Sequence, residues 1–399
     1  MKLLRIFTIL LSAFCFSAIS AQEQEKEYNF DFIWGVDAET VFDNREGDQT
    51  CSPQQTIFFS RLSPSLGVKF WKSEKEIEKN NGIKENRSFD SHKLMAGTHY
   101  IQPIGIGYKE NKFVPTAYYT FSHMVIKEEK RDSSIIRIDG HTSSEFKVWR
   151  VSFGMIPRRL MFQRLPEILW SDSMDYYNPN IRGILLQCTK NNLVFHEISL
   201  DWRSLQSAEQ REAFNVNYNF VKRFRSGLPS TIDPFFIGGN AQLNHLAKRN
   251  PAPEGEGVND DMFVYPYVGL DFSEKTVFDK FKIRAGYAVS FDRCRAIGDW
   301  EVDGGLLAEL HLLWKKIGIK ETLYAGNKQF PLYPMYGSLL NMGDPHYQSS
   351  VYAKTSIYSP IVNNKHVSFG AYLDFHTTKE GTSCYQRVVL NVNLGNVDN

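Results

Sequence analysis

The segment Tyr28–Asp43 reads YNFDFIWGVDAETVFD and decides the fold class. From Phe30 to Phe42 every even position except Thr40 is apolar, whereas the odd positions include several acidic residues and a glycine. Successive side chains of a β-strand point to opposite faces of the sheet. The segment therefore predicts a strand with one apolar face and one polar face.

The same alternation recurs along the chain. Apolar residues alternate with amides, charged residues and glycine in segments 214–224, 281–291 and 388–394. Weaker alternation is present in 58–70, 93–102, 114–126, 146–155, 181–189, 193–202, 231–245, 262–272, 301–314, 317–325, 347–359 and 366–376. Because a single-chain bacterial barrel has an even number of strands, these segments predict an all-β fold of about 16 strands, within about 14 to 18.

The length of these segments favours a membrane barrel. Most exceed the five or six residues that are roughly typical of soluble sheets, and they reach the about 9 to 11 that cross a bilayer. An open sheet edge would leave backbone groups unpaired in hydrocarbon, so the strands must close into a ring. We therefore predict a transmembrane antiparallel β-barrel. The alternative is a soluble β-sandwich, which would bury the apolar faces between two sheets.

Short links between the segments predict antiparallel neighbours. Asn191-Asn192 and Lys315-Lys316 are typical of tight turns. The links 156–180, 246–260 and 326–346 are longer and have the Pro, Gly, Asn and Asp content expected of surface loops. Long and short links alternate in the second half of the chain, but not around 72–90 and 127–145. Either a strand is miscounted there, or those segments extend beyond the membrane on the short-turn side.

The first residues predict export. Lys2 and Arg5 precede an uncharged apolar run that ends in Ser20-Ala21-Gln22, which is typical of a secretory signal peptide over residues 1–21. Residues 22–399 then form one domain. Without Lys2 and Arg5 the chain has 44 basic against 45 acidic residues, a net charge of −1 that does not indicate nucleic-acid binding. The cysteines at 51, 188, 294 and 384 lack the spacing of a zinc site.

The link 156–180 has the densest mixture of charged and aromatic residues in the chain. If it folds into the barrel, arginines that face carboxylates would narrow the pore and give it a solute preference. If it stays outside, the same charges only keep an exposed loop soluble. The candidates for the pore lining, on the link and its flanking strands, are Arg150, Arg158, Arg159, Arg164, Asp172, Asp175, Arg182, Glu197, Asp201 and Arg203.

Three features stand out in the sequence: the signal peptide ending in Ala21-Gln22, the series of hairpins and the segment Pro166–Asn180, which reads PEILWSDSMDYYNPN. In these features the chain resembles the large outer-membrane β-barrel proteins of Bacteroidota-type bacteria. The resemblance covers the whole chain in pattern and names no substrate. Such barrels tend to end on an aromatic residue that the insertion machinery recognises, whereas here Leu394 is followed by Gly-Asn-Val-Asp-Asn.

The sequence predicts a porin-like channel for small hydrophilic solutes, embedded in outer-membrane lipid, and no enzyme. No Gly-x-Ser-x-Gly elbow, dinucleotide fingerprint or P-loop is present, and no histidine pair has metal-ligand spacing, so no cofactor or metal is expected. The length excludes an importer with a plug domain and about 22 strands. Two alternatives remain, a barrel lipid hydrolase with Ser and His on its outer wall and a secreted carbohydrate-binding sandwich.

Overall fold

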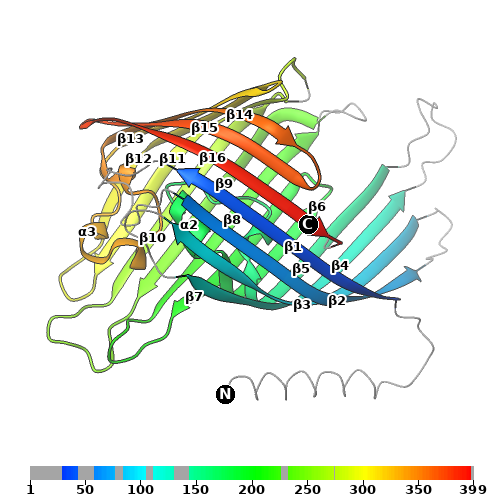
Figure 1. Ribbon diagram of the computed structural model, residues 1–399, viewed down its shortest axis with the longest axis horizontal. Helices are drawn as coiled ribbons and strands as arrows, with labels where there is room; N and C mark the ends of the chain where they lie inside the picture. The colour runs from blue at the N-terminus through cyan, green and yellow to red at the C-terminus, as the bar shows by residue number, and fades with distance from the viewer. Residues whose placement is uncertain are drawn as a thin grey trace.

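The computed structural model describes residues 29–43, 58–76, 84–104, 111–129, 143–225, 232–273 and 275–396. These residues form one closed antiparallel β-barrel in which each strand pairs with its neighbours in sequence and β1 pairs with β16 (Figure 1). The strands are β1 (Asn29–Asp43), β2 (Phe58–Glu76), β3 (Lys84–Ile104), β4 (Lys112–Glu129), β5 (Ser143–Pro157), β6 (Asn180–Lys190), β7 (Val194–Ser204), β8 (Ala213–Arg225), β9 (Ile232–Leu246), β10 (Asn259–Asp271), β11 (Lys280–Cys294), β12 (Glu301–Trp314), β13 (Ile317–Gly326), β14 (Val351–Asn363), β15 (Val367–Thr378) and β16 (Gly381–Gly395). The prediction of about 16 strands is confirmed.

The helices of the described residues lie in two links between strands. The β5–β6 link (residues 158–179) contains η1 (Arg158–Leu160) and α2 (Asp172–Tyr177), and the β13–β14 link (residues 327–350) contains α3 (Tyr333–Tyr336), η2 (Gly337–Leu339) and η3 (Pro345–Gln348). None of these helices is long or apolar enough to cross a membrane.

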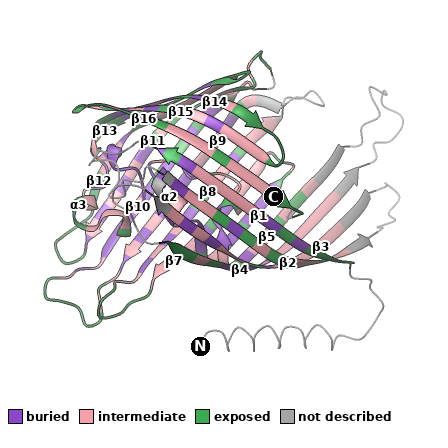
Figure 2. Cartoon of the chain, in the orientation of Figure 1, coloured by how far each residue is buried: buried purple, intermediate pink, exposed green. Residues whose placement is uncertain are grey.

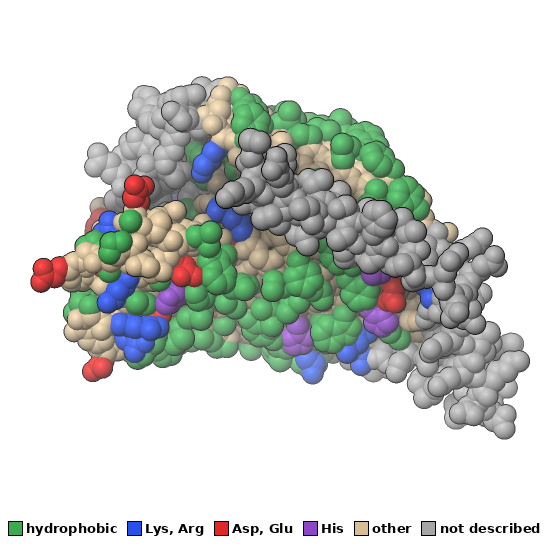
Figure 3. Space-filling view, turned by 90° about the horizontal axis from the view of Figure 1, so that it is seen from below, with side chains coloured by type: hydrophobic (Ala, Val, Ile, Leu, Met, Phe, Trp, Pro, Cys, Tyr) green, Lys and Arg blue, Asp and Glu red, His purple; other side chains and the backbone are tan. Residues whose placement is uncertain are grey.

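The alternation of side chains sorts the barrel into an inside and an outside. Buried and exposed residues alternate along the strands (Figure 2). Large apolar side chains of the outward face remain exposed, among them Phe32 at 57%, Leu66 at 58% and Leu306 at 64%. Hydrophobic side chains cover a broad band of the face seen in Figure 3, and charged residues gather mainly toward its ends. An apolar band on a closed barrel is the surface that contacts acyl chains, so the fold is a transmembrane β-barrel.

The two ends of the barrel differ in their links. One end carries the long β5–β6 and β13–β14 links, and we call it the long-loop end. The opposite, short-turn end carries tight links such as 191–193 and 315–316, where Asn191, Asn192 and Lys315 adopt positive φ angles near 54°. Positive φ is typical of the two-residue hairpin turns that keep adjacent strands in register.

Strands β2 to β4 are the longest in the barrel, with 19, 21 and 18 residues. Their backbone pairing continues at the short-turn end as far as Lys84 opposite Glu129, and Figure 1 shows them projecting there beyond neighbouring strands. Of the two explanations for the irregular links 72–90 and 127–145, the extension is therefore correct. Within the described ranges, no strand is missing from the count.

Candidate functional site

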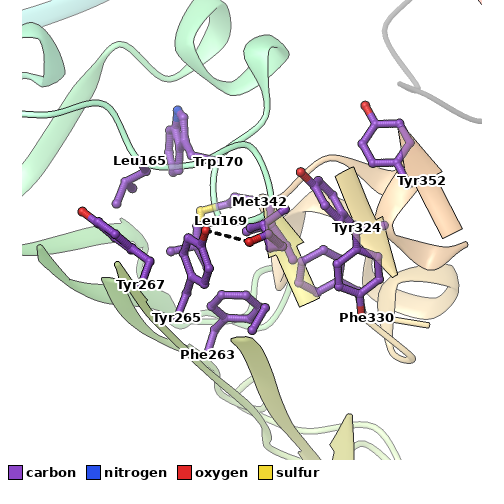
Figure 4. Close-up of a cluster of buried hydrophobic side chains, with 14 of the residues drawn as sticks. Leu165, Leu169, Trp170, Phe263, Tyr265, Tyr267, Tyr324, Phe330, Met342 and Tyr352 are labelled. Carbon is purple, nitrogen blue, oxygen red and sulfur yellow. Dashed lines mark hydrogen bonds between the residues drawn. The ribbon is translucent and has the colours of Figure 1, made fainter. Parts of the chain in front are cut away.

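The β5–β6 link folds into the barrel. Ile168 and Leu169 are fully buried, and Trp170 is 2% exposed. They pack against tyrosine and phenylalanine side chains of the wall, including Phe263 and Tyr265 of β10 (Figure 4). Because the wall aromatics offer these side chains apolar surface shielded from water, a link of this composition is more stable inside the barrel than exposed outside it. Of the two alternatives for this link, the inward one is the one observed.

The β13–β14 link also folds inward over residues 340–347, so the expectation that residues 326–346 form a surface loop is wrong for that part, while Met335 stays exposed. Met342 and Tyr347 are 1% exposed and join the cluster of Trp170. Backbone hydrogen bonds join the two links, from Ser171 N to Met342 O at 2.8 Å and from Asp344 N to Glu167 O at 2.9 Å. The two links therefore form one body that fills the lumen on the side of β8 to β14.

A buried ion pair fixes the start of the β5–β6 link. The Arg158 guanidinium donates to the Asp201 carboxylate of β7, with side chains only 7% and 2% exposed. The guanidinium carbon also lies 3.7 Å from the centroid of the Trp170 ring, and Nε donates to Asn178 O at 3.1 Å. Burial lowers the pKa of Arg158, and the Asp201 charge acts against that shift. A guanidinium paired, stacked and hydrogen-bonded in this way remains charged.

Arg164 lies between two carboxylates at the tip of the link. It donates to Asp172 and lies 2.8 Å from Asp175. Burial opposes its charge, but Asp172 and Asp175 outweigh the burial and raise its pKa. Burial raises the pKa of Asp175 in spite of Arg164. Asp172 also meets two cations of the far wall at 3.5 Å, Lys354 of β14 and Arg387 of β16.

A cavity of about 490 Å³ remains between the β5–β6 link and the wall formed by β1, β2, β3 and β16. Arg159 of the link forms an ion pair with Asp37 of β1, and this pair connects the link to the wall. Arg61 of β2 forms a second pair with Glu39 of β1 along the wall. Its charged lining consists of Arg61, Arg158, Arg159, Arg164, Asp37, Glu39 and Asp175. Charge of both signs is thus held around the open part of the lumen.

The other candidates lie around the link. Arg150 of β5 donates to Gln187 at 3.4 Å, and Glu197 of β7 accepts the Phe162 backbone N–H at 2.7 Å. Arg203 donates to Leu339 O of the β13–β14 link at 2.6 Å. Glu197 and Arg203 thus hold the two inward links to the wall, whereas Arg150 contacts Gln187, which donates to Leu160 O of the β5–β6 link at 2.8 Å.

Arg182 differs from the expectation that it faces the lumen. It shares the outward parity of β6 with Leu186, is exposed, and donates to Arg203 O at 2.8 Å. Its position in the sequence, next to the long link, predicts that Arg182 faces the lumen. The alternation of side chains along β6 instead places it on the outer face.

The sequence reading missed several members of the site. Arg61, Lys354 and Arg387 lie on wall strands far from the link in sequence. Arg387 is on the polar face of the last predicted strand, so the sequence predicts that it faces the lumen. The sequence does not predict its contact with Asp172 across the barrel. Nothing in the local sequence signals such a contact.

Asp344, His346 and His376 bring three possible metal-ligand atoms within 4.8 Å of one another. The rings of His346 and His376 are stacked, with centroids 4.4 Å apart and planes at 24°. His346 Nδ1 bonds to Asp344 Oδ1 at 2.7 Å, and His376 Nδ1 to Tyr352 Oη at 2.8 Å. The group therefore clamps the β13–β14 link to β14 and β15. Burial raises the pKa of Asp344, but the neighbouring His346 outweighs it and the pKa is lowered.

Ser63, His99 and Asn180 form a hydrogen-bonded chain at the cavity wall. Ser63 Oγ lies 2.6 Å from His99 Nδ1, and Asn180 Oδ1 lies 2.9 Å from His99 Nε2. On the outer wall, His196 bonds to Tyr218 and His123 to Asp90. The described residues show no Ser–His hydrogen bond on the outer wall, where the hydrolase alternative requires one.

No protein-family model matches the chain. No curated protein matches it either. Among solved structures, the Salmonella typhi OmpF complex with daunomycin is 11% identical, with 93% of this chain and 99% of that chain covered and a TM-score of 0.43. The outer-membrane channel DcaP of Acinetobacter baumannii is 8% identical over 94% and 99% of the two chains, with a TM-score of 0.39. The Pseudomonas aeruginosa protein OccK7 (OpdD) is 9% identical over 92% and 99%, with a TM-score of 0.35. The fold assignment rests on the strand pairing of this chain itself.

Proposed function

We propose that this chain is a diffusion channel of the bacterial outer membrane that passes small hydrophilic solutes through the charged cavity beside the β5–β6 link. The observation that carries this proposal is the cavity of about 490 Å³ inside a lipid-facing barrel, whose lining contains seven charged side chains among apolar ones such as Leu165 and Trp170. A barrel of about 16 strands encloses a lumen wide enough for water. The two inward links fill part of that lumen, and the space that remains open is the charged cavity beside β1, β2, β3 and β16.

The lining predicts a weak solute preference. Four arginines and three carboxylates line the cavity, a formal excess of one positive charge. Each arginine has a carboxylate partner, so the field is directed across the passage and has little net sign. Fixed charges on opposite walls of a narrow pore orient dipolar solutes and exclude large apolar ones. The channel therefore favours small polar solutes, with a slight preference for anions.

The orientation in the membrane follows from the links. Outer-membrane barrels place short turns in the periplasm and long loops outside. The inward links then enter the lumen from the cell exterior, and the extended strands β2 to β4 project into the periplasm. Cleavage of residues 1–21 as a signal peptide and recognition by the insertion machinery are parts of this proposal, and the signal peptide lies outside the described residues.

The test is conduction by the purified protein in planar bilayers. Asn391 of β16 lines the cavity, whereas its neighbour Leu390 points to lipid. In a cysteine-free background, Asn391→Cys and Leu390→Cys are each treated with a bulky thiol reagent. We expect the current to fall only for Asn391→Cys. A bilayer that stays sealed, or equal effects at both positions, would refute the proposal.

We further propose that the chain is not an enzyme and that the Ser63–His99–Asn180 chain is structural. The three residues come from β2, β3 and β6, and Asn180 Nδ2 also donates to Pro115 O at 3.0 Å. Ser63 is 6% exposed and His99 5%, which leaves an ester little access. A fluorophosphonate probe should leave Ser63 unlabelled. Labelling that disappears in His99→Ala would instead support a hydrolase.

A further inference from the structure

Two aspartates face each other inside the barrel near the long-loop end. Asn244 of β9, Asp261 of β10 and Asp292 of β11 lie directly opposite one another in consecutive strands. All three are buried, with 0%, 1% and 1% exposure. Directly opposite residues have Cβ atoms only about 5 Å apart, so the two carboxylates are close neighbours.

Most of the side-chain oxygen atoms around this pair have no hydrogen-bond partner. Asn244 Nδ2 and Asn341 Nδ2 both donate to Asp261 Oδ2, at 2.8 and 2.6 Å. The remaining oxygens are buried without a partner in the described structure. They are Asn244 Oδ1, Asn259 Oδ1, Asp261 Oδ1, Asp292 Oδ1, Asp292 Oδ2, Ser290 Oγ and Asn341 Oδ1. Buried polar atoms are normally paired, so such a concentration of unpaired acceptors needs an explanation.

The charge of the pair is also unbalanced. Within the described residues, no Lys, Arg or His forms an ion pair with Asp261 or Asp292, and the charged groups that act on Asp292 include Asp303 and Glu301. The cations of this region, His245, Arg293 and Arg295, all pair with Asp260. Asp260 has the opposite parity on β10, so these cations lie on the other side of the sheet. Burying two carboxylates without a cation is costly.

We propose that Asp261 and Asp292 bind a calcium ion, with oxygen ligands from Asn259, Asn341 and their neighbours. Calcium takes about 6 to 8 oxygen ligands from carboxylates, amide carbonyls and water. The unpaired oxygens of this cluster supply that set, and the ion neutralises both carboxylates. Because Asn341 belongs to the β13–β14 link, the ion joins this link to β10 and β11 and holds it inside the lumen.

The experiment uses the full-length mature protein in detergent after treatment with EGTA, and it requires no conduction. Calcium is titrated by calorimetry, and Tb³⁺ luminescence provides a second probe. We expect one saturable site with a Kd on the order of 0.1 to 1 mM, as in extracellular calcium modules. Calcium should also slow tryptic cleavage at Lys328 within the β13–β14 link.

The variants Asp261→Asn and Asp292→Asn should each weaken binding at least tenfold, and Asp299→Asn, at an exposed position of the same barrel end, should bind like the wild type. The absence of saturable binding up to about ten times the expected Kd would overturn the proposal. So would equal binding by all three variants. A protein whose stability changes with pH but not with calcium would show that the two carboxyls share a proton instead.

Discussion

The buried pair between Arg158 and Asp201 makes a quantitative prediction about the β5–β6 link. In Asp201→Asn the guanidinium keeps its place but loses its counter-charge, at a site where the arginine side chain is only 7% exposed. Removing one partner of a buried ion pair costs about 3 to 5 kcal/mol, because the other charge stays buried and unpaired. We expect this cost to appear as easier opening of the link, because the pair joins the link to the wall.

Limited proteolysis measures that opening. Trypsin cuts after Arg159 or Arg164 only when the link leaves the lumen, and when opening is fast relative to cleavage the rate follows the open population. A cost of about 3 to 5 kcal/mol corresponds to cleavage about 10² to 10⁴ times faster, since about 1.4 kcal/mol is tenfold.

The matched control replaces both partners. In the double variant Arg158→Met, Asp201→Leu no charge remains buried, and replacing a buried pair by apolar residues is often nearly neutral. The Trp170 stacking and the bond to Asn178 O are lost in this variant. We therefore expect cleavage much slower than in Asp201→Asn, although faster than in the wild type. If the single and double variants are cut equally fast, or if neither is cut faster than the wild type, the pair does not hold the link.

Three further predictions concern the passage and the outer wall. Arg61→Glu should turn the slight anion preference into a cation preference, because it reverses one charge of the lining, and the reversal potential in a KCl gradient checks this. The raised pKa of Asp175 means that this carboxyl takes up its proton at a higher pH than an ordinary aspartate, so acidification should increase anion preference. In Asp175→Asn the anion preference should hardly change over the same pH range. If this variant responds to pH as strongly as the wild type, Asp175 is not the group that titrates. Ile198→Arg places a charge on the lipid face and should destabilise the barrel by about 2 to 4 kcal/mol in urea titrations in lipid, whereas Ile198→Val should have little effect.

The barrel could be predicted from the sequence because each strand carries its own signal. The alternation from Phe30 to Phe42 requires only that one face meet lipid and the other meet water, and it is visible without knowledge of any distant residue. The even parity of the first strand places Phe30, Phe32 and Trp34 outside, and all three are exposed there. Strand count follows from repeating this local pattern.

Whether the long links lie inside or outside the barrel could not be predicted in the same way. The β13–β14 link has the Gly, Pro and Asn content of an exposed loop, and only its packing against Trp170 and the wall shows that it is buried. The contact of Asp172 with Arg387 spans most of the chain in sequence. Such contacts depend on how wide the closed barrel is and on which side of it remains empty, and neither property is local.

The two inward links contact the wall through different kinds of side chain on the two sides of the lumen. On the side of β8 to β14, Trp170, Met342 and Tyr347 join wall aromatics in one apolar cluster that excludes water. On the side of β1 to β3 and β16, the wall and the link meet through charged pairs such as Arg159 with Asp37 in addition to apolar contacts such as Tyr177 with Phe59. Apolar packing stabilises the links regardless of solute, whereas charged pairs can exchange partners with a passing polar molecule. Solute preference should therefore respond to substitutions around Arg61 and Arg159, and link retention to substitutions around Trp170. Substitutions at Arg158, which contacts both regions, should alter both properties.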